Sequence, residues 1–144
     1  MSNKMETRIL IVDDKADIVE TVSFCFAQEG FEILRAFDGH EALELARREQ
    51  PDLIVLDVML PRENGYQVAR FLRDDWKEGK LKKRPRILLL TARTVFEAER
   101  EEFLQTWSGA DDMMYKPFDL EELVCRVKGM LPETGGAVSR CLRS

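Results

Sequence analysis

Three short runs of consecutive apolar residues most constrain how this chain folds. They are residues 9–12 (ILIV), 53–56 (LIVL) and 87–90 (ILLL). A strand with one face in solvent alternates apolar and polar residues, whereas a strand buried on both faces is apolar throughout. The three runs therefore predict parallel strands with helices on both sides of the sheet. Residues 31–36 and 113–115 are two weaker candidates for strands.

Apolar residues at helical spacing lie between these strands and after the last one. Such spacing occurs in residues 18–26, 42–46, 68–76, 96–107 and 120–131, and the fourth of these segments depends on Phe96, Phe103 and Trp107. No proline falls inside a predicted strand or helix, and Pro132 closes the last helix. The order is strand then helix, five times. It predicts an α/β fold with one doubly wound, five-stranded parallel sheet, right-handed crossovers and five helices.

Length and composition limit the class of protein. The 144 residues fit one domain, which we place at residues 8–131, with a flexible N-terminus at 1–7 and a flexible tail or linker stub at 132–144. The net charge of −5 argues against a general nucleic-acid coat protein, and no apolar run approaches the roughly 20 residues of a membrane span. The three cysteines, Cys25, Cys125 and Cys141, are far apart and odd in number. They predict inert free thiols in a reducing cytoplasm.

A basic stretch at residues 77–86 holds six Lys or Arg side chains. Its simplest interpretation is a solvated loop before the fourth strand. The alternative is a docking patch for an acidic partner.

Charged and polar residues follow the predicted strands at the edge where an open parallel sheet binds ligands. Asp13 and Asp14 follow the first strand, Asp57 ends the third, Thr91 the fourth and Lys116 the fifth. Each has an ordinary explanation when it is taken alone, such as a helix cap or a surface charge. Three carboxylates in one place repel one another unless a cation neutralises them, and oxygen ligands suit Mg²⁺. A hydroxyl and an ammonium beside them suit a phosphoryl group.

Four stretches of sequence carry a family resemblance. They are residues 9–14 (ILIVDD), 52–65 (DLIVLDVMLPRENG), 88–93 (LLLTAR) and 109–118 (GADDMMYKPF). Asp57 with Pro61 four residues later and Gly65 eight residues later is the most specific part. From about residue 8 to residue 131, the chain resembles the receiver domain of two-component response regulators. The resemblance implies a flavodoxin-like sheet with strand order 2-1-3-4-5.

The resemblance also implies a chemistry for the acidic residues. Asp57 would take a phosphoryl group from a histidine kinase or a phosphotransfer protein. Asp13 and Asp14 would bind Mg²⁺ together with Asp57 and the backbone carbonyl of Met59. Such a domain catalyses its own phosphorylation and dephosphorylation and is not an enzyme in the usual sense. A phosphatase of the haloacid dehalogenase type needs a second acid two residues after the nucleophile, where this chain has Met59.

Other positions take roles by the same resemblance. Thr91 would hydrogen-bond a phosphoryl oxygen. Lys116 would pair with the phosphoryl group, and its peptide bond to Pro117 would be cis. The family usually has Tyr or Phe where this chain has Met113. Tyr115 shares a strand face with Met113, so it either replaces that aromatic residue or packs as an ordinary one. The stretch between Thr91 and Lys116 is longer than usual by nearly a helical turn.

The output of such a domain is a contact with another protein. The last helix resembles those of receivers that pair through the fourth helix, fifth strand and fifth helix, where Asp112 and Arg126 match a cross-subunit ion pair. Glu122 matches another such position. We expect a possible homodimer through this face, with no direct binding of nucleic acid or membrane by the domain. The alternative function is a receiver-like binding module that signals without phosphorylation.

Overall fold

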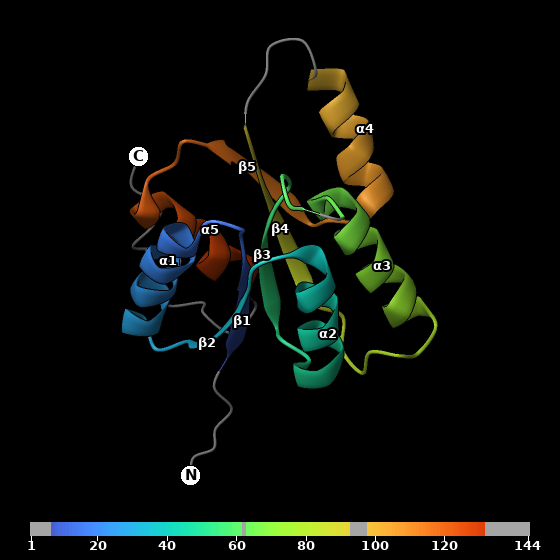
Figure 1. Ribbon diagram of the computed structural model, residues 1–144, viewed down its shortest axis with the longest axis horizontal. Coiled ribbons are helices and arrows are strands. Elements are labelled where there is room, and N and C mark those ends of the chain that lie inside the picture. Colours follow the sequence, from blue (N-terminus) through green and yellow to red (C-terminus); the bar gives the residue numbers. More distant parts are fainter. Residues whose placement is uncertain (1–6, 62, 93–97, 132–144) are drawn as a thin grey trace.

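One parallel sheet forms the centre of the molecule. In the computed structural model, which describes residues 7–61, 63–92 and 98–131, the strands are β1 (Arg8–Val12), β2 (Glu32–Ala36), β3 (Leu53–Asp57), β4 (Arg86–Ala92) and β5 (Asp112–Lys116). They lie in the order β2-β1-β3-β4-β5, and each neighbouring pair is parallel (Figure 1). The predicted flavodoxin-like sheet and both weaker strands are confirmed. The strand order reverses between β1 and β3, which is where such sheets bind ligands.

Five helices connect the strands. They are α1 (Ala16–Gln28), α2 (Gly39–Glu49), α3 (Gly65–Lys77), α4 (Ala98–Ser108) and α5 (Leu120–Met130). Figure 1 shows α1 and α5 on one face of the sheet and α2 and α3 on the other, with α4 beside α3. The predicted number and order of helices are therefore confirmed.

The two faces of the sheet bury two separate apolar cores. In β1, Ile9 and Ile11 belong to the core that contains Phe26 of α1, whereas Leu10 belongs to the core that contains Leu72 of α3. These five side chains are at most 2% exposed. Because successive residues of a strand point to opposite faces, a strand between two helical layers has to be apolar at every position. This is the physical reason for the continuous runs in the sequence.

A capping box starts α3 immediately after the loop that follows β3. The backbone N–H of Gln67 donates to the side chain of Asn64 at 3.0 Å, and the backbone N–H of Asn64 donates to the side chain of Gln67 at 3.1 Å. These bonds satisfy two backbone donors that would otherwise lack partners. They fix where α3 begins relative to the end of β3.

Helix α4 differs from the prediction in the face that it buries. The sequence pattern placed Phe103 and Trp107 on an apolar stripe, but Phe103 is 66% exposed and Trp107 38% exposed, and neither belongs to a core. Phe96, the third residue of that stripe, lies outside the described residues. The helix packs against α3, and its partly buried Leu104 is the residue that reaches a core. The spacing predicted the helix correctly, although Phe103 and Trp107 do not lie in a core.

The ends of the chain and the cysteines complete the comparison with the sequence. The predicted tail at 132–144 and residues 1–6 of the predicted N-terminus lie outside the described residues. Cys25 is a free thiol, whereas Cys125 is disulfide-bonded, so the prediction of three free thiols is wrong for Cys125. Linear spacing does not show which thiols the fold brings together, and Cys141 lies outside the described residues. No helix within the described ranges is long and apolar enough to cross a membrane.

Candidate functional site

The polar residues that follow the strands meet at one edge of the sheet. Asp57 is the last residue of β3, Lys116 is the last residue of β5, and Asp13 directly follows β1. Thr91 lies one residue before the end of β4. Because all five strands run in the same direction, their carboxyl ends lie at the same edge. The fold thus brings together residues that are up to about a hundred positions apart.

Three carboxylates form a cluster at this edge. One oxygen each from Asp13, Asp14 and Asp57 lies within 4.8 Å of the others. The side chains of Asp13 and Asp57 are 2% and 1% exposed, whereas that of Asp14 is 39% exposed. Two of the acids therefore lie beneath the surface, and the third closes the cluster from the solvent side.

The ammonium group of Lys116 contacts the two buried carboxylates. Its Nζ donates a hydrogen bond to Oδ1 of Asp57 at 3.0 Å and lies 3.5 Å from Oδ2 of Asp13. One cation faces two buried anions, with a third anion close by. The cluster thus retains an excess of negative charge, which favours a bound cation.

The electrostatics of the cluster are visible in two pKa shifts. Burial raises the pKa of Asp57, and the charge of Asp13 adds to this rise, although hydrogen bonds from Lys116 and from the backbone N–H of Met59 act in the opposite direction. Burial alone would lower the pKa of Lys116, but the hydrogen bond and charge of Asp57, with the charge of Asp13, outweigh it and raise that pKa. The charged form of Lys116 is therefore stabilised, whereas burial destabilises the charged form of the neighbouring Asp57.

Two buried oxygens of the cluster are left for a ligand. Oδ2 of Asp13 and Oδ2 of Asp57 are buried and have no hydrogen-bond partner. Such groups are rare in folded proteins and cost free energy unless something outside the protein binds them. The other oxygen of Asp13 accepts a hydrogen bond from the backbone N–H of Lys15 at 3.0 Å, which orients the side chain. An all-oxygen donor set of this kind fits Mg²⁺.

A tight turn after β3 packs against the backbone of Asp57. The backbone N–H groups of Leu60 and Gly65 both donate to the carbonyl of Val58, at 3.1 and 2.9 Å. A Cβ atom on Gly65 would lie 2.5 Å from the carbonyl oxygen of Asp57, which is closer than real Cβ atoms approach. The glycine in the sequence motif is therefore required by this contact. The turn leaves the side chain of Met59 70% exposed and its backbone next to Asp57.

Thr91 lies at the same edge but is not bonded to the carboxylates. Its side chain is buried, with 6% exposed, and its hydroxyl donates at 3.5 Å to the backbone carbonyl of Ala92. The peptide bond from Lys116 to Pro117 is cis, as the resemblance implied. Arg93, the last residue of the LLLTAR stretch, lies outside the described residues.

Met113 contacts an aromatic residue that the sequence did not point to. The hydroxyl of Tyr66, on α3, donates to the sulfur of Met113 at 3.8 Å. Tyr66 is buried, and Met113 packs against the same core. The signal in the sequence was weak, because Tyr66 reads as an ordinary member of the apolar face of α3. Tyr115 is paired in register with Thr91 on β4 and is partly buried.

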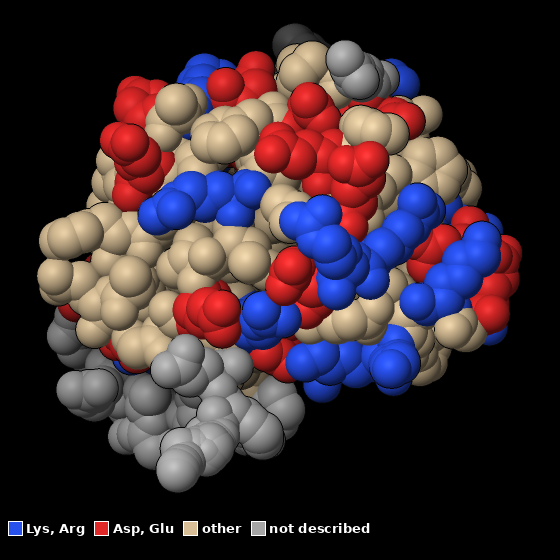
Figure 2. Space-filling model, turned by 60° about the horizontal axis from the view of Figure 1, so that its bottom comes forward, with Lys and Arg blue, Asp and Glu red and all other residues tan. Residues whose placement is uncertain are grey.

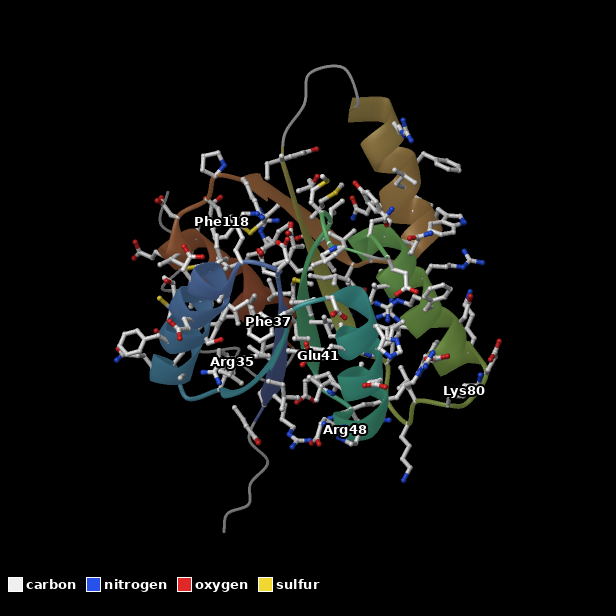
Figure 3. All side chains as sticks on the ribbon, in the orientation of Figure 1. Arg35, Phe37, Glu41, Arg48, Lys80 and Phe118 are labelled. Atoms are coloured by element: carbon white, nitrogen blue, oxygen red, sulfur yellow. The ribbon has the colours of Figure 1, made fainter. Side chains whose placement is uncertain are left out.

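A shallow groove of about 480 Å³ adjoins Lys116 on the side of α1. It is lined by residues of α1 and of the segment after β5, and the labelled Phe118 lies above α1 in Figure 3. The apolar residues of the lining are Ile18, Val22, Pro117, Phe118 and Leu120. The sequence analysis did not identify this groove, because it is built from two segments about a hundred residues apart.

Asp112 and Arg126 pair with each other within the chain. Nη1 of Arg126 donates to Oδ2 of Asp112 at 2.9 Å, and the two side chains are 37% and 39% exposed respectively. The resemblance placed these residues in a cross-subunit ion pair. In the single chain they form an intramolecular one that remains accessible to solvent.

Comparison with known proteins assigns a family to this geometry. Residues 9–128 match the response regulator receiver domain. The chain belongs to this family. Alkaline phosphatase synthesis transcriptional regulatory protein PhoP of Bacillus subtilis is 42% identical over 127 residues, which cover 88% of this chain and 49% of that protein. The receiver thus spans about half the length of this curated relative.

Solved structures agree with the fold of the receiver. The chemotaxis protein CheY4 of Vibrio cholerae superimposes with a TM-score of 0.76 at 30% identity, covering 88% of this chain and all of that one. The activated DrrB receiver domain has a TM-score of 0.71 at 31% identity, covering 87% of this chain and 97% of that chain. The same DrrB from Thermotoga maritima is an OmpR/PhoB homologue, of which this chain covers 52%.

Proposed function

We propose that this receiver accepts a phosphoryl group on Asp57 from a histidine kinase or a phosphotransfer protein, in the presence of Mg²⁺, and thereby switches a protein–protein output surface. One observation carries the proposal. The carboxylate of Asp57 is buried at the end of β3, next to a second buried carboxylate and within 3.0 Å of the Lys116 ammonium. An isolated surface aspartate would have none of these neighbours.

The transfer itself needs positioning and charge neutralisation more than covalent help from the protein. An oxygen of Asp57 attacks the phosphorus of a phosphohistidine. The O–P bond forms as the P–N bond breaks, and the imidazole leaves with the electron pair of that bond and takes up a proton from water. The product is an acyl phosphate on Asp57. Reaction with water releases inorganic phosphate and returns the free carboxylate, so the reactions of the domain are its own phosphorylation and dephosphorylation.

Mg²⁺ would be held by Asp13, Asp14 and Asp57, with the backbone carbonyl of Met59 as a further ligand. The bound ion would supply positive charge for the oxygens of the incoming phosphoryl group. The unpartnered Oδ2 atoms of Asp13 and Asp57 support this assignment. Lys116 supplies a second positive charge at the same place.

Thr91 would stabilise the phosphorylated form. Its hydroxyl has only the long contact with the Ala92 carbonyl among the hydrogen bonds described here, so little is lost when it turns toward a phosphoryl oxygen. Lys116 would move from the Asp57 carboxylate to a phosphoryl oxygen of the same residue. Both changes occur at the ends of β4 and β5, next to the surface that would be switched.

The kinase or phosphotransfer protein would dock at the groove between α1 and the segment after β5. The groove is mostly apolar and leads directly to Lys116. A partner helix that packs there would bring its phosphohistidine to the carboxyl edge of the sheet. The output surface would be the α4–β5–α5 face, through which a homodimer is one possible outcome. A cytoplasmic location, where such kinases present their phosphohistidine, belongs to the same proposal.

Phosphorylation from acetyl phosphate with Mg²⁺ tests the proposal without knowledge of the kinase. The wild-type protein should gain one phosphoryl group that hydroxylamine removes, as measured by intact mass. Asp57→Asn should gain none, whereas Asp119→Asn, on an exposed residue before α5, should behave like the wild type. No uptake by the wild type, with beryllofluoride also leaving the surroundings of Thr91 unchanged, would instead favour the binding module that signals without phosphorylation.

A further inference from the structure

A second concave site lies on the opposite side of the molecule from α1. It is a groove of about 250 Å³ between α3 and the C-terminal end of α4. Trp76 and Trp107 both line it, and they are the two tryptophans of the chain. Each is 38% exposed, which is unusual for so large an apolar side chain. Nothing in the proposed phosphoryl transfer uses this groove.

The floor of the groove is rigid. Arg73 is 5% exposed, and its guanidinium donates to the carbonyls of Gly109 and Pro85, each at 2.7 Å, and to Asp111 at 2.6 Å. These bonds join α3 to the end of α4 and to the start of β4. Arg70 holds the rim, because its guanidinium lies 5.4 Å from the ring centre of Trp107 and also donates to the carbonyl of that residue at 2.9 Å. The site is therefore preformed, which lowers the cost of binding.

The groove carries an excess of positive charge. Its basic lining residues are Arg70, Arg73, Lys77 and Arg84. Two carboxylates pair with them: Asp74 lies 3.4 Å from Arg70, and Asp111 is shared by Arg73 and Arg84. Lys77 is exposed and makes no ion pair within the described residues. Four positive charges against two negative charges leave a surplus of two.

The loop between α3 and β4 carries further basic residues beyond the groove. Lys80, Lys82 and Lys83 are exposed, and two of them are paired, Lys80 with Glu78 at 3.3 Å and Lys83 with Asp52 at 2.7 Å. Figure 2 shows Lys and Arg side chains gathered on this side of the molecule. Figure 3 places Lys80 at the far end of α3. The loop that the sequence left open between a solvated segment and a docking patch is thus next to an aromatic groove.

We infer that the α3–α4 groove is a docking site for an acidic segment of a partner protein. An apolar side chain of that segment would pack between Trp76 and Trp107. Its flanking carboxylates would face Lys77 and Arg84. This combination of a buried apolar anchor and a charged rim is typical of protein–protein recognition.

Two other classes of ligand fit the groove less well. A volume of about 250 Å³ is below that of ordinary small-molecule sites and suits a single side chain. Nucleic-acid bases need free aromatic faces, whereas Arg70 already lies over the ring of Trp107.

Because both tryptophans of the chain line the groove, their fluorescence can report binding there. We would titrate the full chain with a synthetic peptide that has one Leu flanked by Glu residues, and follow the intrinsic tryptophan emission. Saturable change of the emission, weakened when ionic strength is raised from roughly 0.05 to 0.5 M, is the expected result. A peptide of the same length with Gln in place of Glu should bind at least about fivefold more weakly.

Paired variants separate a specific site from general charge. Lys77→Gln should weaken binding of the acidic peptide roughly two- to fivefold, and Trp76→Ala about tenfold. Arg35→Gln removes one charge from an exposed position on β2, away from Lys80 in Figure 3, and should leave binding unchanged. Circular dichroism shows whether each variant is folded.

Four results would overturn the inference. They are equal loss of affinity in Lys77→Gln and Arg35→Gln, no emission change with the acidic peptide, a larger change with a single-stranded oligonucleotide than with the peptide, and an emission change that depends on protein concentration alone. The last would indicate a second copy of the chain as the occupant. None of these measurements requires phosphorylation of Asp57, so they fail or succeed independently of the proposed function.

Discussion

The side chain of Lys116 reaches across the end of one strand to bond Asp57. The two residues end β5 and β3, which are separated in the sheet by β4, and Nζ of Lys116 lies 3.0 Å from Oδ1 of Asp57. Thr91 lies on the intervening strand, one residue before its end. A phosphoryl group on Asp57 would therefore meet the hydroxyl of Thr91 on β4 and the ammonium of Lys116 on β5. This arrangement explains why a local chemical change at β3 could be felt at β5.

Replacement of Lys116 by glutamine should slow phosphorylation of Asp57 without abolishing it. The variant loses the positive charge that, in the proposed function, meets the incoming phosphoryl group, while Asp57 and the other proposed Mg²⁺ ligands are unchanged. We expect uptake from acetyl phosphate to be roughly 10- to 100-fold slower, as measured by intact mass over time. Lys15→Gln is the matched control, because Lys15 is exposed and lies 3.7 Å from Asp14 rather than beside Asp57. Equal slowing in both variants would mean that Lys116 acts only through the general charge of this edge.

Removal of the Asp57 charge should stabilise the fold. The pKa of Asp57 is raised in the folded state, so the folded protein holds this proton more tightly than the unfolded chain does. That contribution favours folding at low pH and is lost as the pH rises through the folded-state pKa. At neutral pH without Mg²⁺, Asp57→Asn should raise Tm by about 3–6 °C. The gain should shrink as the pH falls through the raised folded-state pKa and vanish below the unfolded value of about 3.9.

The more exposed acid of the cluster provides the comparison for this effect. Asp14 is 39% exposed, so Asp14→Asn should raise Tm by less than about 2 °C. Addition of Mg²⁺ should stabilise the wild type more than Asp57→Asn, because the variant has lost a ligand. A variant Asp57→Asn that is less stable than the wild type across this pH range would show that the bond to Lys116 outweighs burial and repulsion.

Most of the fold, and the cluster of polar residues at the carboxyl ends of the strands, could be predicted from the sequence because both depend on local patterns. The continuous apolar runs reflect burial on two faces, and the acids follow strands whose ends must meet in a parallel sheet. The Asp57, Pro61 and Gly65 spacing reflects the turn whose glycine lies against the Asp57 carbonyl. These features can be predicted because each is determined within a few residues along the chain.

The remaining features depend on which segments meet in space. The contact of Tyr66 with Met113 joins residues 47 positions apart, and the hydrogen bond from Arg73 to Asp111 joins residues 38 positions apart. Neither pair has a local signature. The exposure of Phe103 and Trp107 on α4 has no local signature either, since the two residues have helical spacing whether they face a core or solvent. The pairing of Trp107 with Arg70 on α3 appears only in the folded chain.

Homodimerisation through the α4–β5–α5 face can be tested at the Asp112–Arg126 pair. Both side chains are more than one third exposed, so Arg126→Gln should change the free energy of unfolding by less than about 1 kcal/mol. If the pair exchanges partners between subunits, beryllofluoride with Mg²⁺ should produce a dimer of the wild type that Arg126→Gln weakens. Sedimentation velocity at several concentrations measures this. A monomer under all conditions would contradict the dimer.

Two glycine substitutions should have opposite effects on stability. In Gly65→Ala the new Cβ would lie 2.5 Å from the Asp57 carbonyl oxygen and 2.9 Å from the Cα of Val58, and both of these are backbone atoms that cannot turn away. We expect a loss of about 2–4 kcal/mol in the free energy of unfolding, measured by urea denaturation. Gly129→Ala, in α5, meets no atom within 4 Å and should gain about 0.5–1 kcal/mol from helix propensity.

The same pair of variants connects stability to the site. Because Gly65 packs against the backbone of Asp57, Gly65→Ala should also reduce phosphoryl uptake in the fraction that remains folded, whereas Gly129→Ala should leave it unchanged. Uptake is measured from acetyl phosphate and normalised to folded protein by circular dichroism. Normal uptake by a folded Gly65→Ala protein would show that the turn after β3 shifts without moving Asp57. The close approach would then serve packing alone, and the requirement for glycine at this position would be independent of the chemistry at Asp57.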